Sequence, residues 1–184
     1  MIDGDVLVCL VGESGSGKTT VAKYLHDKGY NVIQSYTTRP PREENEWGHK
    51  FIDHLAFLKE GASPGWDNCI AYKELYGYFY WATYQQYQGK GISIYVIDPE
   101  GAKQVKENVK DAEVIIIYLA VGEDVRLERL SLRSPHGLYS KKFGEAYDRI
   151  MQDREMFKVV PCDVVVNGER ITRTIAEDIL GVVE

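Results

Sequence analysis

The chain has 184 residues, 44% of them hydrophobic and 27% charged, which suits one globular domain with a buried core. Its net charge of −6 disfavours a broad nucleic-acid-binding surface, so a bound anion would need a local cluster of basic residues. No leader-like segment precedes the first apolar run, and no apolar run approaches the about 18 residues of a membrane span. We therefore expect a cytoplasmic protein without nucleic-acid or membrane partners, in which Cys9, Cys69 and Cys162 are reduced and mostly buried thiols.

The first predicted strand, residues 6–11, leads into a motif that indicates the ligand class. Residues 12–19 match the phosphate-loop pattern G-x-x-x-x-G-K-[ST], and a helix is expected over residues 20–28. In such a loop, backbone N–H groups point at phosphate oxygens, and the helix N-terminus adds partial positive charge. Lys18 is predicted to reach the β- and γ-phosphates, and the Thr19 hydroxyl to bind Mg²⁺. The predicted ATP-binding residues here are Gly12, Glu13, Ser14, Gly15, Ser16, Gly17, Lys18, Thr19 and Thr20.

Short apolar strands alternate with amphipathic helices along the rest of the chain. Strands are predicted over residues 93–97, 114–119 and 162–166, and helices over residues 101–109, 123–132, 141–157 and 171–180. The strand 114–119 is apolar throughout, as expected for a strand covered on both faces. The pattern predicts an α/β fold, a parallel sheet of the P-loop NTPase type with helices on both faces.

Two segments break this alternation. Residues 35–90 are rich in Tyr, Trp, Gly and Pro and lack a long helical period, so we expect an inserted subdomain of short strands and loops. Residues 133–141 are polar and are expected to form a mobile segment. The predicted single domain, residues 1–184, thus has a core of residues 1–34, 91–132 and 158–184, the insert 35–90, and a lid region of residues 133–157.

The segments after the phosphate loop resemble, in the same order, those of the guanylate kinase family. The most specific is SYTTRPPR at residues 35–42, which is similar to the family's S-x-T-T-R-x-P-R. Further similarities cover residues 48–52, 76–83, 96–105, 126–133 and 163–167, and so nearly the whole chain. The resemblance implies a nucleoside monophosphate kinase that transfers a phosphoryl group from ATP, with Mg²⁺, to (d)GMP. It also implies that the insert 35–90 binds the acceptor.

The resemblance implies an acceptor site made of five residues. Arg39, Arg42 and Tyr80 would hold the acceptor phosphate, for which two planar guanidinium groups are suited. Ser35 and Asp98 would contact the acceptor base, and a Mg²⁺-bound water is the alternative partner of Asp98. Asp98 follows a predicted strand, where ligands bind in open parallel sheets, but a helix-capping role competes.

Basic residues near the predicted lid are candidates for the transfer step. Arg133 and Arg149, with Arg129 as a further candidate, would meet the transferring phosphoryl group as the lid closes and excludes water. Arg129 is alternatively a helix-surface residue paired with an acidic neighbour. The predicted catalytic residues are thus Lys18, Arg39, Arg133 and Arg149. Asn167 would lie beside the adenine of ATP or, alternatively, cap the turn after its strand.

The chain departs from the family where the family reads guanine. The glutamate that recognises guanine corresponds to Ala71, and the first aspartate of the D-I-D segment corresponds to Val96. Glu74 stands three residues after Ala71, an odd offset that would turn it to the other face of a strand. The tyrosine that contacts phosphate is replaced by His49 or Phe51. The phosphate-handling residues are retained, and the base-reading residues are altered.

Three functions are therefore open. The first is phosphoryl transfer from ATP to (d)GMP. The second keeps the chemistry but uses another acceptor, either a different nucleoside monophosphate or a sugar phosphate, and Ala71 and Val96 favour it. The third is a non-catalytic guanylate-kinase-like binding domain, which the intact pair Lys18–Thr19 disfavours.

Overall fold

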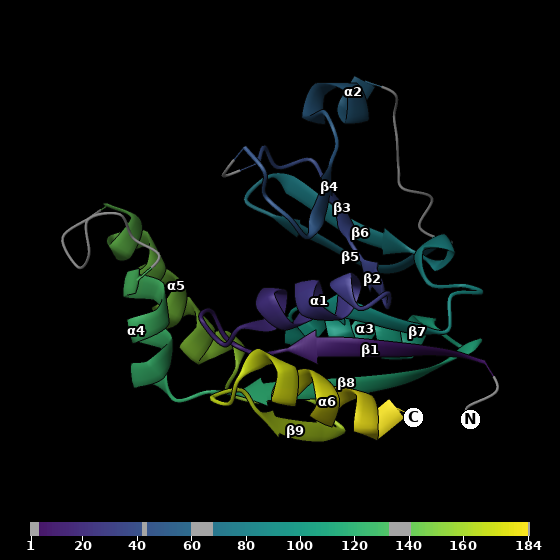
Figure 1. Ribbon diagram of the computed structural model, residues 1–184. Helices are drawn as coiled ribbons and strands as arrows, with labels where there is room; N and C mark the ends of the chain where they lie inside the picture. Colours follow the sequence, from purple (N-terminus) through teal and green to yellow (C-terminus); the bar gives the residue numbers. More distant parts are fainter. Residues whose placement is uncertain (1–3, 42–43, 60–67, 133–140, 184) are drawn as a thin grey trace.

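The molecule is built on two sheets, a parallel core sheet and a smaller mixed sheet above it (Figure 1). The computed structural model describes residues 4–41, 44–59, 68–132 and 141–183. The core sheet has the order β2-β7-β1-β8-β9, and every neighbouring pair in it is parallel. Its strands are β1 (Asp5–Val11), β2 (Asn31–Ile33), β7 (Ile92–Val96), β8 (Ala112–Ala120) and β9 (Val164–Asn167).

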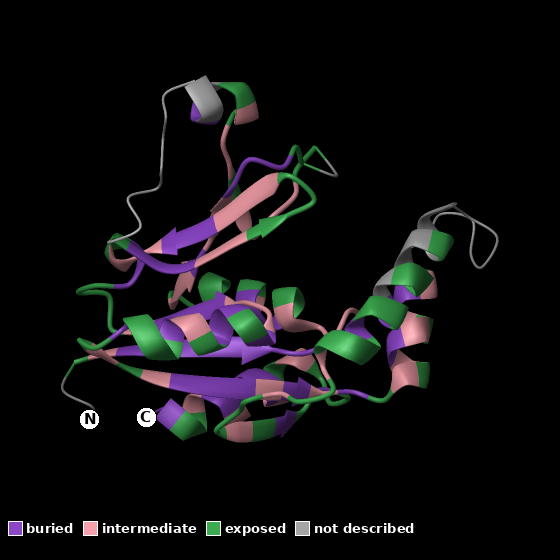
Figure 2. Ribbon diagram, turned by 180° about the vertical axis from the view of Figure 1, so that it is seen from behind, coloured by how far each residue is buried: buried purple, intermediate pink, exposed green. Residues whose placement is uncertain are grey.

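Both faces of the core sheet are covered. Successive side chains of β1 alternate between two hydrophobic clusters, because neighbouring residues of a strand point to opposite faces. One cluster packs against α1 (Lys18–Asp27) and α6 (Thr172–Val183), and the other against α3 (Pro99–Asn108) and part of the second sheet. Figure 2 shows the buried residues running along the central strands. The predicted parallel sheet with helices on both faces is confirmed.

The second sheet occupies the middle of the chain and has the order β4-β3-β6-β5. Its strands are β3 (Ser35–Thr37), β4 (His49–Phe51), β5 (Cys69–Leu75) and β6 (Tyr78–Thr83). Only the β3–β4 pair is parallel. The short helix α2 (His54–Lys59), which the sequence did not predict, places Phe57 against Trp81 of this sheet. A 3₁₀ turn, Tyr84–Gln86, leads back to the core.

Two helices extend away from the core sheet beyond β8, namely α4 (Glu123–Leu132) and α5 (Lys141–Met156) (Figure 1). The Arg154 guanidinium donates to both carboxylate oxygens of Glu123 and so joins the two helices near the sheet. The segment predicted to be mobile, residues 133–141, lies almost wholly outside the described residues. Cys9 and Cys69 are buried, whereas Cys162 is exposed; the expectation of a mostly buried thiol is wrong there because β9 begins only at Val164.

Candidate active site

The site lies where β1 and β7 end, at the same edge of the core sheet. The phosphate loop follows β1, and residues 97–98 follow β7, which pairs with β1. The Ile97 N–H donates to the carbonyl oxygen of Leu10 at 3.3 Å, so the two strand ends stay in contact. The carboxyl edge of an open parallel sheet is where ligands bind in such folds.

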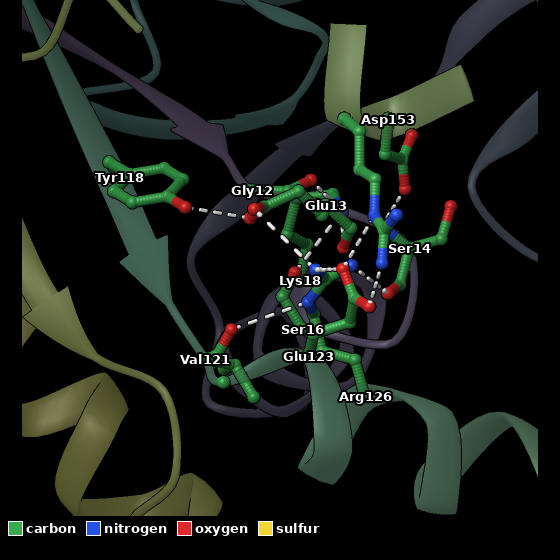
Figure 3. Close-up of polar contacts among 12 residues, drawn as sticks. Gly12, Glu13, Ser14, Ser16, Lys18, Tyr118, Val121, Glu123, Arg126 and Asp153 are labelled. Carbon is green, nitrogen blue, oxygen red and sulfur yellow. Dashed lines mark hydrogen bonds and ion pairs between the residues drawn. The ribbon is translucent and has the colours of Figure 1, made fainter. Parts of the chain in front are cut away.

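The phosphate loop, residues 12–19, wraps around the amino group of Lys18 (Figure 3). Lys18 Nζ donates to the carbonyl oxygens of Gly12, at 2.5 Å, and Glu13, at 3.0 Å. It also donates to the Ser16 hydroxyl at 3.2 Å. The loop turns tightly at Gly15, where φ is 85° and a Cβ atom would lie 2.8 Å from the carbonyl oxygen of Arg126. A side chain is therefore excluded at position 15.

Helix α1 begins at Lys18, within the motif of residues 12–19. Gly17 is its N-cap, with φ at 96°, a left-handed conformation that suits glycine. The first turn of α1 carries no acidic side chain, so the positive end of the helix dipole faces the loop without a neutralising carboxylate of its own. Thr19 and Thr20 are exposed at this end of the helix.

One backbone N–H of the phosphate loop donates a hydrogen bond to a carboxylate. The Ser14 backbone N–H donates to Oδ2 of Asp153, at 2.6 Å, and Asp153 is buried on α5 (Figure 3). An anionic oxygen thus sits on a backbone N–H of the type that binds phosphate. Sequence reasoning did not find Asp153, because it lies 139 residues from Ser14 within a helix of ordinary amphipathic pattern.

Glu13 is held by a hydroxyl and a guanidinium. The Tyr118 hydroxyl donates to Glu13 Oε2 at 2.8 Å, and Arg126 Nη2 lies 3.8 Å from Oε1. Burial, followed by the hydrogen bond to Glu13, raises the pKa of Tyr118 to about 12. The Glu13 side chain therefore has a structural role in fixing the loop against β8 and α4.

Two arginines of α4 hold the backbone of the phosphate loop. Arg126 is buried and donates to the carbonyl oxygens of Val121, at 3.3 Å, and Ser14, at 3.4 Å. Arg129 donates to the carbonyl oxygens of Ser16, at 3.3 Å, and Gly168, at 3.0 Å. These contacts place Arg129 at the phosphate loop.

Asn167 ends β9 beside the last of these contacts. Its Oδ1 accepts a hydrogen bond from the Glu169 N–H at 2.9 Å, which forms the turn into the segment before α6. Asn167 also lines a shallow depression of about 500 Å³ with Tyr118 and Val165. The turn-capping alternative for Asn167 is thus present, and the predicted contact with adenine stays a prediction.

Arg39, predicted to hold the acceptor phosphate, is buried at the end of β3 and is paired with a carboxylate. Its Nη2 and Nη1 donate to the two carboxylate oxygens of Glu46, at 2.7 and 3.1 Å. Its guanidinium carbon also lies 5.5 Å from the centre of the Phe51 ring. Burial lowers the pKa of Arg39, but the hydrogen bond and charge of Glu46, with a contribution from Tyr80, raise it overall.

A cavity of about 220 Å³ opens between the second sheet and the end of β7. Ser35, Tyr80 and Asp98, three of the predicted acceptor residues, line it together with Ala71 and His49. The Ser35 hydroxyl lies 3.0 Å from His49 Nδ1. The structure therefore brings together the two predicted base-contacting residues and one predicted phosphate-contacting residue.

Lys73, which sequence reasoning missed, lines the same cavity. Its amino group donates to Asp98 Oδ2 at 2.8 Å, and Asp98 Oδ1 accepts from the Gly101 N–H at 2.9 Å. Asp98 thus caps α3 and pairs with Lys73 at once. The alternation of a strand puts residue 73 on the same face as Ala71, and this local signal was available from the sequence. Glu74, by contrast, is exposed.

Three predicted residues are left without a described side chain. Arg42 and Arg133 lie outside the described residues, and Arg149 lies on α5 with its side chain outside them as well. Among the described residues there is no cluster of three or more His, Cys, Asp or Glu side chains that would hold a metal ion. None of the helices in the described ranges has the length and apolar character needed to cross a membrane.

Comparisons with known proteins find sequence similarity to several guanylate kinases. No family model matches the chain. The guanylate kinase of Wolbachia sp. subsp. Brugia malayi is 29% identical over 182 residues, which cover 94% of this chain and 89% of that protein. The guanylate kinase of Helicobacter pylori strain 26695 is 31% identical over 69% of this chain. This match spans 64% of the length of the Helicobacter protein, and the match to the Nitrosomonas europaea guanylate kinase spans 58% of that relative.

A solved structure gives the same result for the fold. The crystal structure of guanylate kinase from Anaplasma phagocytophilum superimposes with a TM-score of 0.57 and 22% identity, covering 97% of this chain and 84% of that one. The superposition covers almost the whole of this chain, so the likeness concerns its overall fold. Together with the similarity to the Wolbachia protein over 94% of this chain, these findings support a divergent relative of the guanylate kinases.

Proposed function

We propose that this protein transfers the γ-phosphoryl group of ATP to a nucleoside monophosphate, with GMP or dGMP as the first acceptor to test. The observation that carries the proposal is the complete phosphate loop after β1, beside a cavity at the end of the neighbouring strand β7 whose lining includes Lys73 and Asp98. Donor and acceptor sites on adjacent strand ends bring two phosphorylated ligands together, which is the main requirement of phosphoryl transfer.

The donor site fits a nucleoside triphosphate with Mg²⁺. The loop already binds an anionic oxygen, the Asp153 carboxylate on the Ser14 N–H. Phosphate oxygens would replace it there, and Lys18 would exchange its carbonyl partners for the β- and γ-phosphates. The exposed Thr19 hydroxyl and the phosphate oxygens would hold Mg²⁺, which supplies charge neutralisation when bound.

The acceptor site would use the fork of Arg39 for the acceptor phosphate. The paired hydrogen bonds to Glu46 support this role, because the geometry that holds a carboxylate in two-point contact also suits a phosphate. Glu46 would have to leave as the acceptor phosphate arrives. Tyr80, on the wall of the cavity, would donate to the same phosphate, and Arg42, Arg133 and Arg149 would supply the further positive charge.

The experiment is a coupled ADP-release assay with ATP, Mg²⁺ and GMP. Lys18→Ala is expected to lower kcat by about 100-fold or more while the melting temperature is kept, because Lys18 acts on the phosphates. Lys23→Ala, an exposed lysine of α1, is the matched control and should have wild-type activity. Near-normal turnover in Lys18→Ala, or no ADP release with any nucleoside monophosphate, would overturn the proposal.

A further inference from the structure

The lining of the cavity of about 220 Å³ includes an ion pair between Lys73 and Asp98. Lys73 lies on β5, and Asp98 follows the end of β7. The cavity is smaller than the roughly 300–1,000 Å³ that enclose a drug-sized ligand, so it suits one part of a nucleotide, such as the base. Its lining is more apolar than polar, with Ala71, Leu75 and Ile97 among the lining residues. The inference drawn from this pair rests on the proposed kinase function.

The pair offers one donor and one acceptor side by side. A lysine ammonium has three N–H donors and no acceptor, whereas a carboxylate only accepts. The contact between them uses one Lys73 proton, and Asp98 Oδ1 also accepts from Gly101. The cap on α3 fixes the carboxylate in place. A ligand edge that matches this pair presents an acceptor to Lys73 and a donor to Asp98.

Such an edge is a ring carbonyl beside a ring N–H. Guanine and hypoxanthine have it at their 6-oxo side, and thymine and uracil have it at their 4-oxo side. In the same pose adenine and cytosine would turn an amino donor to Lys73 and an unprotonated nitrogen to Asp98, so like would meet like at both groups. Charge-assisted hydrogen bonds strengthen both the attraction in the first case and the penalty in the second.

Guanine differs from hypoxanthine only by its 2-amino group, a second donor that needs a second acceptor. Ala71, buried on the cavity wall two residues from Lys73 along β5, has no polar side-chain atom to provide one. A site that does not hydrogen-bond a group cannot reject the analogue that lacks it, because no buried polar atom is left unpaired.

We infer that the acceptor site selects oxo bases as a class, through Lys73 and Asp98, and does not select guanine by its 2-amino group. GMP, IMP and dTMP are then all acceptors, and AMP and CMP are poor ones. Lys73 is a specificity-determining residue for the base.

The test measures kcat/KM for GMP, IMP, dTMP, AMP and CMP at saturating ATP and Mg²⁺. GMP and IMP are expected within about fivefold of each other, and AMP and CMP at least about 10-fold below both. A preference for GMP over IMP of about 100-fold, or equal use of AMP and GMP, would overturn the inference while leaving the kinase function standing. Absence of turnover with every nucleoside monophosphate would instead overturn the proposed function on which the inference rests.

Two variants test whether the lining of the cavity determines the base preference. Lys73→Met is expected to raise KM for GMP and IMP by about 10-fold or more, with KM for ATP unchanged, since only the base loses a donor. Lys103→Met, on the exposed surface of α3, is the matched control. Ala71→Glu is expected to raise the GMP-to-IMP ratio of kcat/KM by about 10-fold or more, by supplying the second acceptor. Unchanged base preferences in a folded Lys73→Met protein would overturn the role of Lys73.

Discussion

The carboxylate of Asp153 accepts a 2.6 Å hydrogen bond from the backbone N–H of Ser14, so a side chain of α5 occupies part of the phosphate loop. Since a phosphate on this N–H must displace Asp153, we expect Asp153→Asn to bind ATP or ADP about 3- to 10-fold more tightly. The substitution removes a negative charge and keeps an acceptor oxygen. Calorimetric titration with ADP checks it, with Glu155→Gln, exposed on the same helix, as the control. Weaker binding in Asp153→Asn would show that the carboxylate supports the loop.

Arg126 is expected to matter for stability through its contacts with the loop. Its buried guanidinium lies within reach of the Val121 and Ser14 carbonyl oxygens and of the Glu13 carboxylate. Arg126→Met leaves these groups without their donor and is expected to lower the free energy of unfolding by about 2 kcal/mol. Urea unfolding measures it. Arg154→Met, which removes an exposed pair with Glu123, should lose clearly less, because water screens an exposed ion pair. Equal losses in the two variants would refute the assignment.

Arg39 gives a prediction for the acceptor side of the reaction. Arg39→Lys replaces a two-point fork by a single ammonium, so KM for GMP is expected to rise by about 10-fold or more with KM for ATP unchanged. Steady-state kinetics with each substrate varied in turn separates the two constants. Lys50→Arg, an exposed position on β4, serves as a control for a basic substitution in the same sheet. A rise in KM for ATP alone would assign Arg39 to the donor.

The contacts of Asp163 lead us to expect that the free energy of unfolding falls in acid. It accepts hydrogen bonds from the Ile116 N–H, at 2.8 Å, and from Lys106, and it thereby joins β8, α3 and the start of β9. Burial acts to raise the pKa of Asp163, but these hydrogen bonds and the Lys106 charge lower it overall from 3.8. A depressed folded-state pKa gives stability that is present above pH 3.8 and is lost as pH falls through the lower folded value.

Urea unfolding of Asp163→Asn at pH 7 and at stepwise lower pH tests this sign. The variant is expected to be less stable than wild type at pH 7, and the two free energies of unfolding should converge as pH falls below 3.8. A difference that stays constant over this range would mean that the stabilisation does not depend on the charge of Asp163.

The core of the fold was predictable from local patterns, and the missed elements are the short or polar ones. The strands β1, β7 and β8 are mainly apolar because both of their faces are covered, and such a run can be recognised from its own residues alone. The strand β2 has only three residues, including Asn31, and the helix α2 has six. Neither length contains enough of a period to be distinguished from loop.

The site, too, has one part that could be predicted from the sequence and one part that could not. The phosphate loop is a contiguous motif, so its residues could be named from the sequence, and the structure finds Lys18 within it. The partners of the site residues come from far along the chain or from loops. Asp153 contacts Ser14 from α5. Lys73, on the second sheet, contacts Asp98, which follows a strand of the core sheet. Glu46, which contacts Arg39, lies in the irregular segment before β4. Contacts of this kind depend on tertiary packing, which no local periodicity encodes.

The two carboxylate oxygens of Asp98 accept hydrogen bonds from different parts of the fold. One accepts from the first turn of α3, and the other accepts from the amino group of Lys73. The first contact anchors the carboxylate to the core, and the second depends on one position of β5. Substitutions at positions 71 and 73 would therefore retune which base is accepted while the anchored carboxylate and the phosphate loop stay as they are. On the proposed function, acceptor choice would thus depend on two positions of β5, whereas the phosphate loop lies on a different element.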